Sequence, residues 1–454
     1  MSCVKRCLAA FTASALAALL VGCGGNSTET SLILNGTPAG TGGDSASVDT
    51  PTGPNTTEIV VDSGPPSGFS LGAANIAYVS VTVCTPGSST ACVTIDHVIL
   101  DTGSIGLRLL KSTLAGLALP PVMLPADAAS ATPAGEAVEC YPFVLGGLWG
   151  ALASADLQIG GERALSLPVQ LIDDGMPAAI TAPADCVAAS NGGLLNSVSS
   201  LQANGVLGVG MLAYDCGLNC ISGNYSGLGY TLYYSCGSGA GAACAPAAIP
   251  SGLQVQNPVV HFEPNADGTV DNNGTIIRLP ALPDLGVGIA KGRLVFGIGT
   301  QSNNQISPTA TMVSVDPDPA SATYLYLSTT VGMTTYTDSY IDSGSNALFF
   351  DDAAIPLACQ SSSGAAGGWY CPPALLKMTA TLHDPFGGMG QADFRIANAD
   401  ALFSTSSLAF ADLGGSVNQG AHTFVWGLPF FYGRSVYTSI WGQALSPNGP
   451  WNAF

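Results

Sequence analysis

Charged side chains are scarce in this sequence, and positive ones are the scarcest. Lysine and arginine number 11 against 30 aspartates and glutamates, so the net charge is −19, and charged residues make up only 9% of the chain. Proteins that bind nucleic acid neutralise phosphates with clustered lysine and arginine side chains. With so few of them, we expect no nucleic-acid partner. The acidic balance keeps a protein soluble but does not select a fold.

A long apolar run is missing at the N-terminus. The run from Leu8 to Val21 is shorter than the roughly 20 residues of a transmembrane helix. It follows Lys5 and Arg6, as in a signal peptide. It ends at Cys23 in a sequence that resembles a bacterial lipobox, which implies cleavage before Cys23 and acylation of its thiol. We therefore predict a lipoprotein signal peptide at residues 1–22. An ordinary signal peptide followed by a chance cysteine is the alternative.

The segment after the predicted cleavage site has little apolar surface. Residues 23–67 are rich in Gly, Ser, Thr, Pro and Asn, a composition typical of flexible linkers. We predict a lipid-anchored tether that holds a folded body away from a membrane. The protein would then be exported to a bacterial cell envelope, facing the periplasm or in the outer membrane. The tether contains Val60-Val61-Asp62-Ser63-Gly64. Two prolines follow, and because they lack backbone donors they block a tight hydrogen-bonded loop, so we assign Asp62 no functional role.

Zinc-binding spacings are also missing, because no Cys-x-x-Cys pair occurs and the four histidines lie far apart. We expect no metal site and no cofactor. Ten cysteines remain after those of the signal peptide and Cys23 are set aside, and an even number in an exported chain predicts up to five disulfides. Cys84 and Cys92 flank a Thr-Pro-Gly-Ser turn and form an attractive local pair. Sequence alone leaves the other connectivities open.

Helical periodicity is absent as well, whereas glycine (57) and proline (30) are frequent and interrupt the chain throughout. Between them lie short runs rich in β-branched and aromatic residues, such as 77–83 and 323–327. The sequence therefore predicts a mostly β protein.

One motif occurs twice in this body. Val98-Ile99-Leu100-Asp101-Thr102-Gly103-Ser104 recurs as Ser339-Tyr340-Ile341-Asp342-Ser343-Gly344-Ser345. Each copy is followed, further along the chain, by two apolar residues and a glycine: Val206-Leu207-Gly208 and Val425-Trp426-Gly427. Such self-similarity indicates two related structural units that each supply one aspartate. Asp-Ser/Thr-Gly triplets also form ordinary turns, which is the alternative for either copy alone.

The ordered pair of motifs resembles the pepsin-like aspartic peptidase superfamily, in an uncharacterised bacterial exported branch with a domain of unknown function. The resemblance is scattered over much of the body, from Tyr78 to Trp441. It implies a bilobal acid-protease fold with two related β-lobes and a cleft between them. We place the N-terminal lobe at 68–255 and the C-terminal lobe at 256–454. The resemblance also implies a polypeptide as substrate or ligand, and we expect a monomer.

In that family two aspartates share the chemistry, and the matching positions here are Asp101 and Asp342. Like-charge repulsion makes two adjacent carboxylates share one proton, so one acts as base toward water and the other as acid. Thr102 and Ser343 match the hydroxyl residues that lock the two loops together. Gly103 and Gly344 match the tight turns, while Ser104 and Ser345 match hydroxyls that hold the outer carboxylate oxygens.

Two positions depart from the family pattern. The flap tyrosine of the family falls on Phe143, with Tyr141 two residues earlier and on the same side of a strand. Either ring could close over substrate or simply pack within the hairpin. Arg108 stands where the family often has tryptophan. It could bind a substrate carboxylate or pair with an acidic side chain, and a surface ion pair is the plainest interpretation.

These observations favour a membrane-anchored aspartic endopeptidase that hydrolyses polypeptides with a water activated by two aspartates. The departures at Phe143 and Arg108 motivate an alternative, a non-catalytic peptide- or protein-binding envelope lipoprotein on the same fold. A structural or adhesive envelope protein is a third possibility.

Overall fold

The computed structural model describes residues 45–47, 53–66, 74–127, 132–175, 180–190, 193–225, 230–237, 243–357, 359, 368–417, 422–446 and 448–454. The predicted signal peptide and Cys23 lie outside the described residues. Among the described residues, no helix has the length and apolar character needed to cross a membrane.

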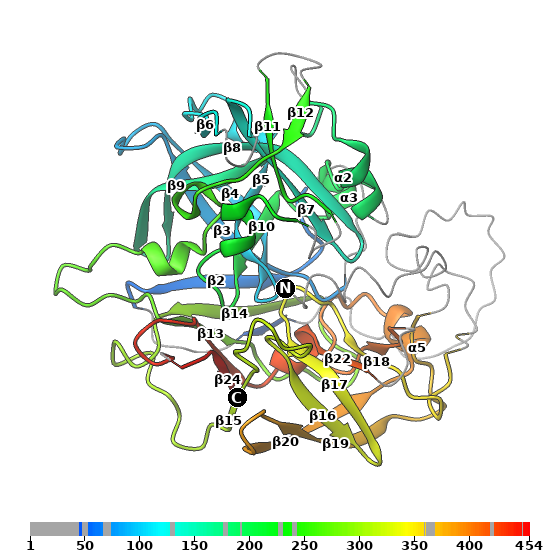
Figure 1. The fold of residues 1–454 in the computed structure, drawn as a ribbon. Coiled ribbons are helices and arrows are strands. Elements are labelled where there is room, and N and C mark those ends of the chain that lie inside the picture. Colours follow the sequence, from blue (N-terminus) through cyan, green and yellow to red (C-terminus); the bar gives the residue numbers. More distant parts are fainter. Residues whose placement is uncertain are drawn as a thin grey trace, which may run out of the picture.

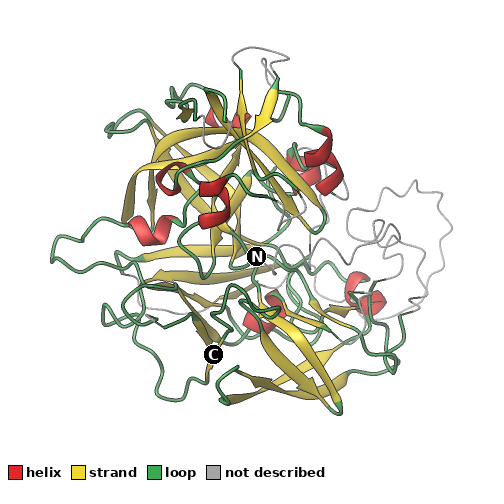
Figure 2. Cartoon of the chain, viewed as in Figure 1, coloured by secondary structure: helices red, strands yellow, loops and turns green. Residues whose placement is uncertain are grey.

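The described chain is mostly β, as predicted (Figure 2). The first strands are β1 (Ser45–Ser47), β2 (Thr56–Val61), β3 (Ala77–Cys84), β4 (Cys92–Asp101), β5 (Ile105–Leu110), β6 (Met123–Leu124), β7 (Gly135–Phe143), β8 (Gly146–Ile159), β9 (Glu162–Ile172), β10 (Gly205–Val209), β11 (Tyr233–Cys236) and β12 (Cys244–Pro246). The others are β13 (Gly274–Arg278), β14 (Ile289–Phe296), β15 (Met312–Ser314), β16 (Leu327–Val331), β17 (Thr334–Ile341), β18 (Leu348–Phe350), β19 (Leu376–His383), β20 (Met389–Ile396), β21 (Gly414–Gly415), β22 (Thr423–Trp426), β23 (Ser435–Ser439) and β24 (Trp451–Ala453).

The helices are short and lie in the connections. They are α2 (Ala184–Ala189), α3 (Val198–Leu201), α4 (Leu218–Ser222), α5 (Ala399–Phe403) and the 3-10 turns η1 (Lys111–Leu114), η2 (Ser251–Leu253), η3 (Pro258–His261) and η4 (Leu428–Phe431).

The strands form one large and one smaller hydrogen-bonded sheet, of seventeen and seven strands in the described part. Figure 1 shows β3 to β12 in its upper part and β16 to β22 in its lower part, with β2 and β14 crossing between them. β2 pairs antiparallel with both β3 and β14, so it joins strands from the first and second halves of the chain.

The position of β2 corrects the predicted tether. Residues 23–67 were expected to be a flexible linker, yet Ile59 and Val61 on β2 are fully buried in the largest core cluster. Five of the six residues of Thr56–Val61 are β-branched, and Ile59 and Val61 face the core, which suits a strand between two partners. Asp62, directly after the strand, lies against His97 with a 3.4 Å Oδ2–Nε2 distance. The folded body therefore includes residues 53–66.

The repeated motif is also a structural repeat. β4 ends at Asp101, and β10 pairs parallel with β4 and antiparallel with β5, the strand that follows the aspartate. In the second copy, β22 pairs parallel with β17 and antiparallel with β18. The apolar pairs predicted from sequence thus lie on β10 and β22, and they insert between the two strands that flank each aspartate.

The glycine that ends each apolar pair is required by close packing. A Cβ on Gly208 would lie 2.5 Å from the nitrogen of Ile105, and one on Gly427 would clash with the carbonyl oxygen of Ala347. Both obstacles are backbone atoms of the chain just after an aspartate loop, so a larger residue would push the loop away.

Five disulfides are present among the described residues, as the even cysteine count predicted: Cys84–Cys92, Cys140–Cys186, Cys216–Cys220, Cys236–Cys244 and Cys359–Cys371. The local pair Cys84–Cys92 closes the hairpin of β3 and β4, in which the two cysteines are directly opposite. Four of the five pairs close short loops, so each mainly restrains its own hairpin or turn.

Candidate active site

Asp101 and Asp342 lie on two loops that contact each other. Asp101 is the last residue of β4 and Asp342 directly follows β17. Both side chains are buried, with 6% and 9% exposure. A Cβ on Gly103 would lie 2.8 Å from Oδ1 of Asp342, and one on Gly344 would lie 2.6 Å from Oδ1 of Asp101. Each loop therefore presents its glycine to the opposite carboxylate, at a distance that leaves no room for a side chain.

The two loops are locked by reciprocal hydrogen bonds. The Ser343 amide donates to Oγ1 of Thr102 (2.9 Å), and the Thr102 amide donates to Oγ of Ser343 (3.1 Å). Each hydroxyl in turn donates to a carbonyl on the other loop. The Thr102 hydroxyl donates to Ile341 (3.4 Å), and the Ser343 hydroxyl donates to Leu100 (2.8 Å). All four bonds cross from one half of the chain to the other, so they fix the separation of the two aspartates.

Each carboxylate also accepts two hydrogen bonds from its own loop. Oδ1 of Asp101 accepts the Gly103 amide (2.8 Å), while Oδ2 accepts the Ser104 hydroxyl (2.5 Å). Asp342 repeats this pattern with the Gly344 amide (2.9 Å) and the Ser345 hydroxyl (2.7 Å). All six supporting residues predicted from the motif therefore make contacts at the aspartate pair. The equivalent bonds give the site an approximate twofold arrangement.

The electrostatic environment favours a shared proton. Burial, followed by the negative charge of Asp342, raises the pKa of Asp101 far above its ordinary value. The Ser104 hydroxyl and the Gly103 amide oppose this effect. Asp101 therefore resists ionisation beside Asp342, and two adjacent carboxyls of this kind can share one proton. A protonated and an ionised carboxyl side by side can act together as acid and base.

Residues 51–454 match the family described as "Protein of unknown function (DUF3443)". The chain belongs to this family. No curated protein matches the sequence. Among solved structures, it is similar to the aspartic proteinase from Irpex lacteus, with a TM-score of 0.43, 12% sequence identity and coverage of 88% of this chain and 96% of that one. The segment shared with the DUF3443 family includes β2 and both aspartate loops.

Next to the aspartate pair of this DUF3443 protein lies the hairpin of β7 and β8. Its aromatic residues Tyr141 and Phe143 face Leu148 and Gly146 across the hairpin, and their ring centroids are 5.0 Å apart. Burial raises the pKa of Tyr141 above its ordinary value, and the charge of Asp101 contributes to this shift. Phe143 packs against a different cluster of buried residues. The two neighbouring rings therefore pack against different groups of buried residues.

Arg108 is held in a buried network that the sequence did not reveal. Its Nη2 lies 2.6 Å from Oε1 of Glu139 and 3.2 Å from Oδ2 of Asp215, and its Nε donates to Oε2 of Glu139 (3.1 Å). The guanidinium carbon lies 3.7 Å from the centroid of the Tyr141 ring. Arg108 and Glu139 are fully buried. The predicted pairing with an acidic side chain is thus present, but the surface location is wrong.

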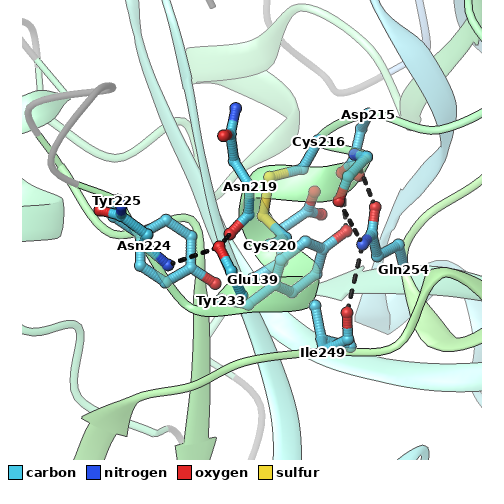
Figure 3. The surroundings of a disulfide bond; sticks show 12 residues. Glu139, Asp215, Cys216, Asn219, Cys220, Asn224, Tyr225, Tyr233, Ile249 and Gln254 are labelled. Atoms are coloured by element: carbon cyan, nitrogen blue, oxygen red, sulfur yellow. Dashed lines mark hydrogen bonds between the residues drawn. A yellow bond between two sulfur atoms is a disulfide. The ribbon is translucent and has the colours of Figure 1, made fainter. Parts of the chain in front are cut away.

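The far side of this network is built by a disulfide loop (Figure 3). Asp215 accepts a 2.7 Å hydrogen bond from the Tyr233 hydroxyl and directly precedes the Cys216–Cys220 disulfide. The Gln254 side chain bonds both the amide and the carbonyl of Gly217 within the same loop. These contacts hold Asp215 against Arg108. Sequence spacing gave no signal for them, because the partners come from β7, β11 and two separate loops.

Proposed function

We propose that this chain is an aspartic endopeptidase with a bilobal pepsin-like fold, in which Asp101 and Asp342 activate the water that hydrolyses a polypeptide. The observation that carries the proposal is the reciprocal set of hydrogen bonds between Thr102 and Ser343. A chance pair of Asp-Ser/Thr-Gly turns has no reason to place its hydroxyls on each other's loops. Both loops are built alike, with two buried carboxylates between them.

The chemistry follows from one proton shared by two carboxyls. The ionised carboxylate accepts a proton from water as the water oxygen attacks the peptide carbonyl carbon, and the protonated carboxyl donates its proton to the carbonyl oxygen. Collapse of the tetrahedral intermediate breaks the C–N bond, and the nitrogen leaves with a proton from the pair. The products are a carboxylic acid and an amine. The hydrogen bonds from Ser104 and Ser345 hold the carboxyls in position throughout.

Tyr141 supports the same site in this proposal. Its ring lies under the Arg108 guanidinium, on the hairpin next to the aspartate pair. In this position Tyr141 would cover a bound peptide and exclude water. The sequence had offered both Tyr141 and Phe143 for this role. Arg108 positions Tyr141 rather than binding substrate, because its guanidinium already donates to Glu139, Asp215 and the carbonyl of Ile105.

The cellular setting completes the proposal. Acylation at Cys23 would anchor the protein in a bacterial envelope, with the residues between Cys23 and β1 as the tether. The five disulfides suit an exported protein. The protein would act as a monomer on polypeptides.

The test is cleavage of a denatured protein mixture by the full mature chain, from acidic to neutral pH, beside the variants Asp101→Asn and Asp342→Asn. Asp62→Asn is the matched control, because Asp62 has the same Asp-Ser-Gly sequence but binds His97. Fragments made by wild type and Asp62→Asn, but by neither dyad variant, are the expected result. An absence of fragments with a folded, disulfide-intact sample would reject the peptidase and favour a polypeptide-binding envelope protein.

A further inference from the structure

Glu162 is a buried acid whose carboxyl oxygens lie near Asp271 and Asn265 but make no hydrogen bond of ordinary geometry within the described part of the chain. It is the first residue of β9, its exposure is 1%, and neither side-chain oxygen has a hydrogen-bond partner in the described part of the chain. Burying an ionised carboxylate without a compensating partner costs roughly several kcal/mol of free energy relative to leaving it in water. None of the ion pairs found among the described residues involves it. A group from outside the chain would remove this cost.

The carboxyl of Glu162 lies next to a second buried acid. Burial, followed by the neighbouring Asp271, raises the pKa of Glu162 to about 8, while Asn265 opposes the shift. Asp271 is fully buried as well. Apart from Glu162, the side chains around Asp271 are neutral amides and a hydroxyl, which now face it as hydrogen-bond donors. Its carboxylate accepts hydrogen bonds from Asn265 (2.9 Å), Thr300 and Gln301, and a longer one from Asn304 (3.5 Å).

Three separate segments build this cluster. Glu162 follows the turn between β8 and β9, Asn265 and Asp271 lie between η3 and β13, and 300–304 follow β14. In Figure 1, β9 belongs to the upper part, whereas β13 and β14 lie in the middle. Gly297, with a φ of +75°, lets the third segment approach, because a Cβ there would clash with both Thr300 and Asp271. The cluster therefore connects strands from the two halves of the chain.

We propose that Glu162 and Asp271, with side-chain oxygens of Asn265, Thr300 and Gln301, bind one calcium ion. Calcium takes six to eight oxygen ligands in flexible geometry, and carboxylates, amide oxygens and hydroxyls are the donors present here. The Asn265 and Gln301 amides can present oxygen in place of nitrogen by rotating about their last bond. One divalent cation would neutralise both acids without any lysine or arginine.

The role that follows is structural. The ion would tie the β8–β9 turn to the loops before β13 and after β14, and so hold the two halves of the chain together. None of its ligands hydrogen-bonds with the loops of Asp101 or Asp342. The site therefore does not depend on the proposed peptidase activity.

Calorimetric titration of calcium chloride into the chelator-stripped full chain tests the proposal, with the thermal midpoint measured in parallel. We expect saturable binding, a higher midpoint with calcium, and binding weakened at least about tenfold in Glu162→Gln. Glu263→Gln is the matched control, because Glu263 is an exposed glutamate near the same loop. The Glu263→Gln variant should bind calcium as wild type does and should show the same rise in thermal midpoint. No calcium binding by wild type, or equal binding by Glu162→Gln, would overturn the site.

Hydrogen exchange on wild type covers the case in which Glu162→Gln does not fold. Calcium should slow exchange at 160–163, 265–271 and 297–304, and slowing confined to other segments would overturn the proposal. A third result is also informative. If calcium changes nothing and Glu162→Gln is more stable than wild type, Glu162 is a protonated acid bonded to Asp271, and the calcium site is rejected.

Discussion

At the scale of single residues, every carboxylate oxygen of the aspartate pair accepts a hydrogen bond, yet negative charge is unfavourable at this buried site. Gly103, Ser104 and their counterparts donate to every carboxylate oxygen, yet burial and the charge of Asp342 raise the pKa of Asp101 and oppose its ionisation. Such a pair is costly to the folded state at neutral pH, which is typical of a functional site rather than of a core.

The pH dependence of stability should reveal this cost. Because the pKa of Asp101 is raised in the folded state, its contribution to stability is fully present below about pH 4, the value for an unfolded aspartate, and is lost as the pH rises toward the raised pKa. Asp101→Asn removes that loss. Chemical denaturation at pH 4 and pH 7 should show a smaller decrease for Asp101→Asn than for wild type. An equal decrease in both would contradict a raised pKa at Asp101.

Arg108 carries a second residue-scale prediction. Arg108→Met keeps much of the side-chain volume but leaves Glu139 and Asp215 as buried acids without their cation. Removing one partner of a buried ion pair lowers the free energy of unfolding by about 3–5 kcal/mol. Urea denaturation measures this, and Arg163→Met, at an exposed arginine, should change it by less than about 0.5 kcal/mol. A loss as small as that of the control would show that the network does not stabilise the fold.

At the scale of elements, the repeated motif was readable from sequence, whereas β2 was not. The motif has two copies of similar residue types, because the residues after each aspartate contact the opposite loop or the carboxylate of their own loop. The six residues of β2 stand among Gly, Pro and Ser, and their partners on β14 lie more than two hundred positions away. Composition averaged over the segment therefore indicated a linker. The Arg108 network was missed for the same reason, since its acids come from distant strands and loops.

Truncation within β2 tests its place in the core. Ile59→Ala should lower the free energy of unfolding by about 2–5 kcal/mol, because the Ile59 side chain is fully buried. Thr57→Ala, at a partly buried position of the same strand, is the control and should cost much less. Thermal or urea denaturation measures both. A flexible tether would predict no effect from either substitution, and that outcome would contradict the assignment of β2 to the body.

At the scale of the whole molecule, β2 and the aspartate loops join the two halves of the chain at different places. β2 links β3 to β14 through main-chain pairing, and Thr102 and Ser343 link the loops through hydroxyls. The mostly β class and the five disulfides could be predicted from composition and cysteine count. The disulfide partners of most cysteines could not be predicted from the sequence, because they depend on tertiary packing.

The central claim is that Asp101 and Asp342 act as one catalytic unit. The most direct measurement is kcat/KM on a peptide containing a mapped cleavage site, for wild type, Asp101→Asn, Asp342→Asn and the double variant. Residues that work as a unit are strongly non-additive, so each single change should lower kcat/KM by about 10⁴-fold or more, and the double variant should be no worse. Full activity in either single variant, or losses that multiply in the double variant, would contradict the two-aspartate mechanism.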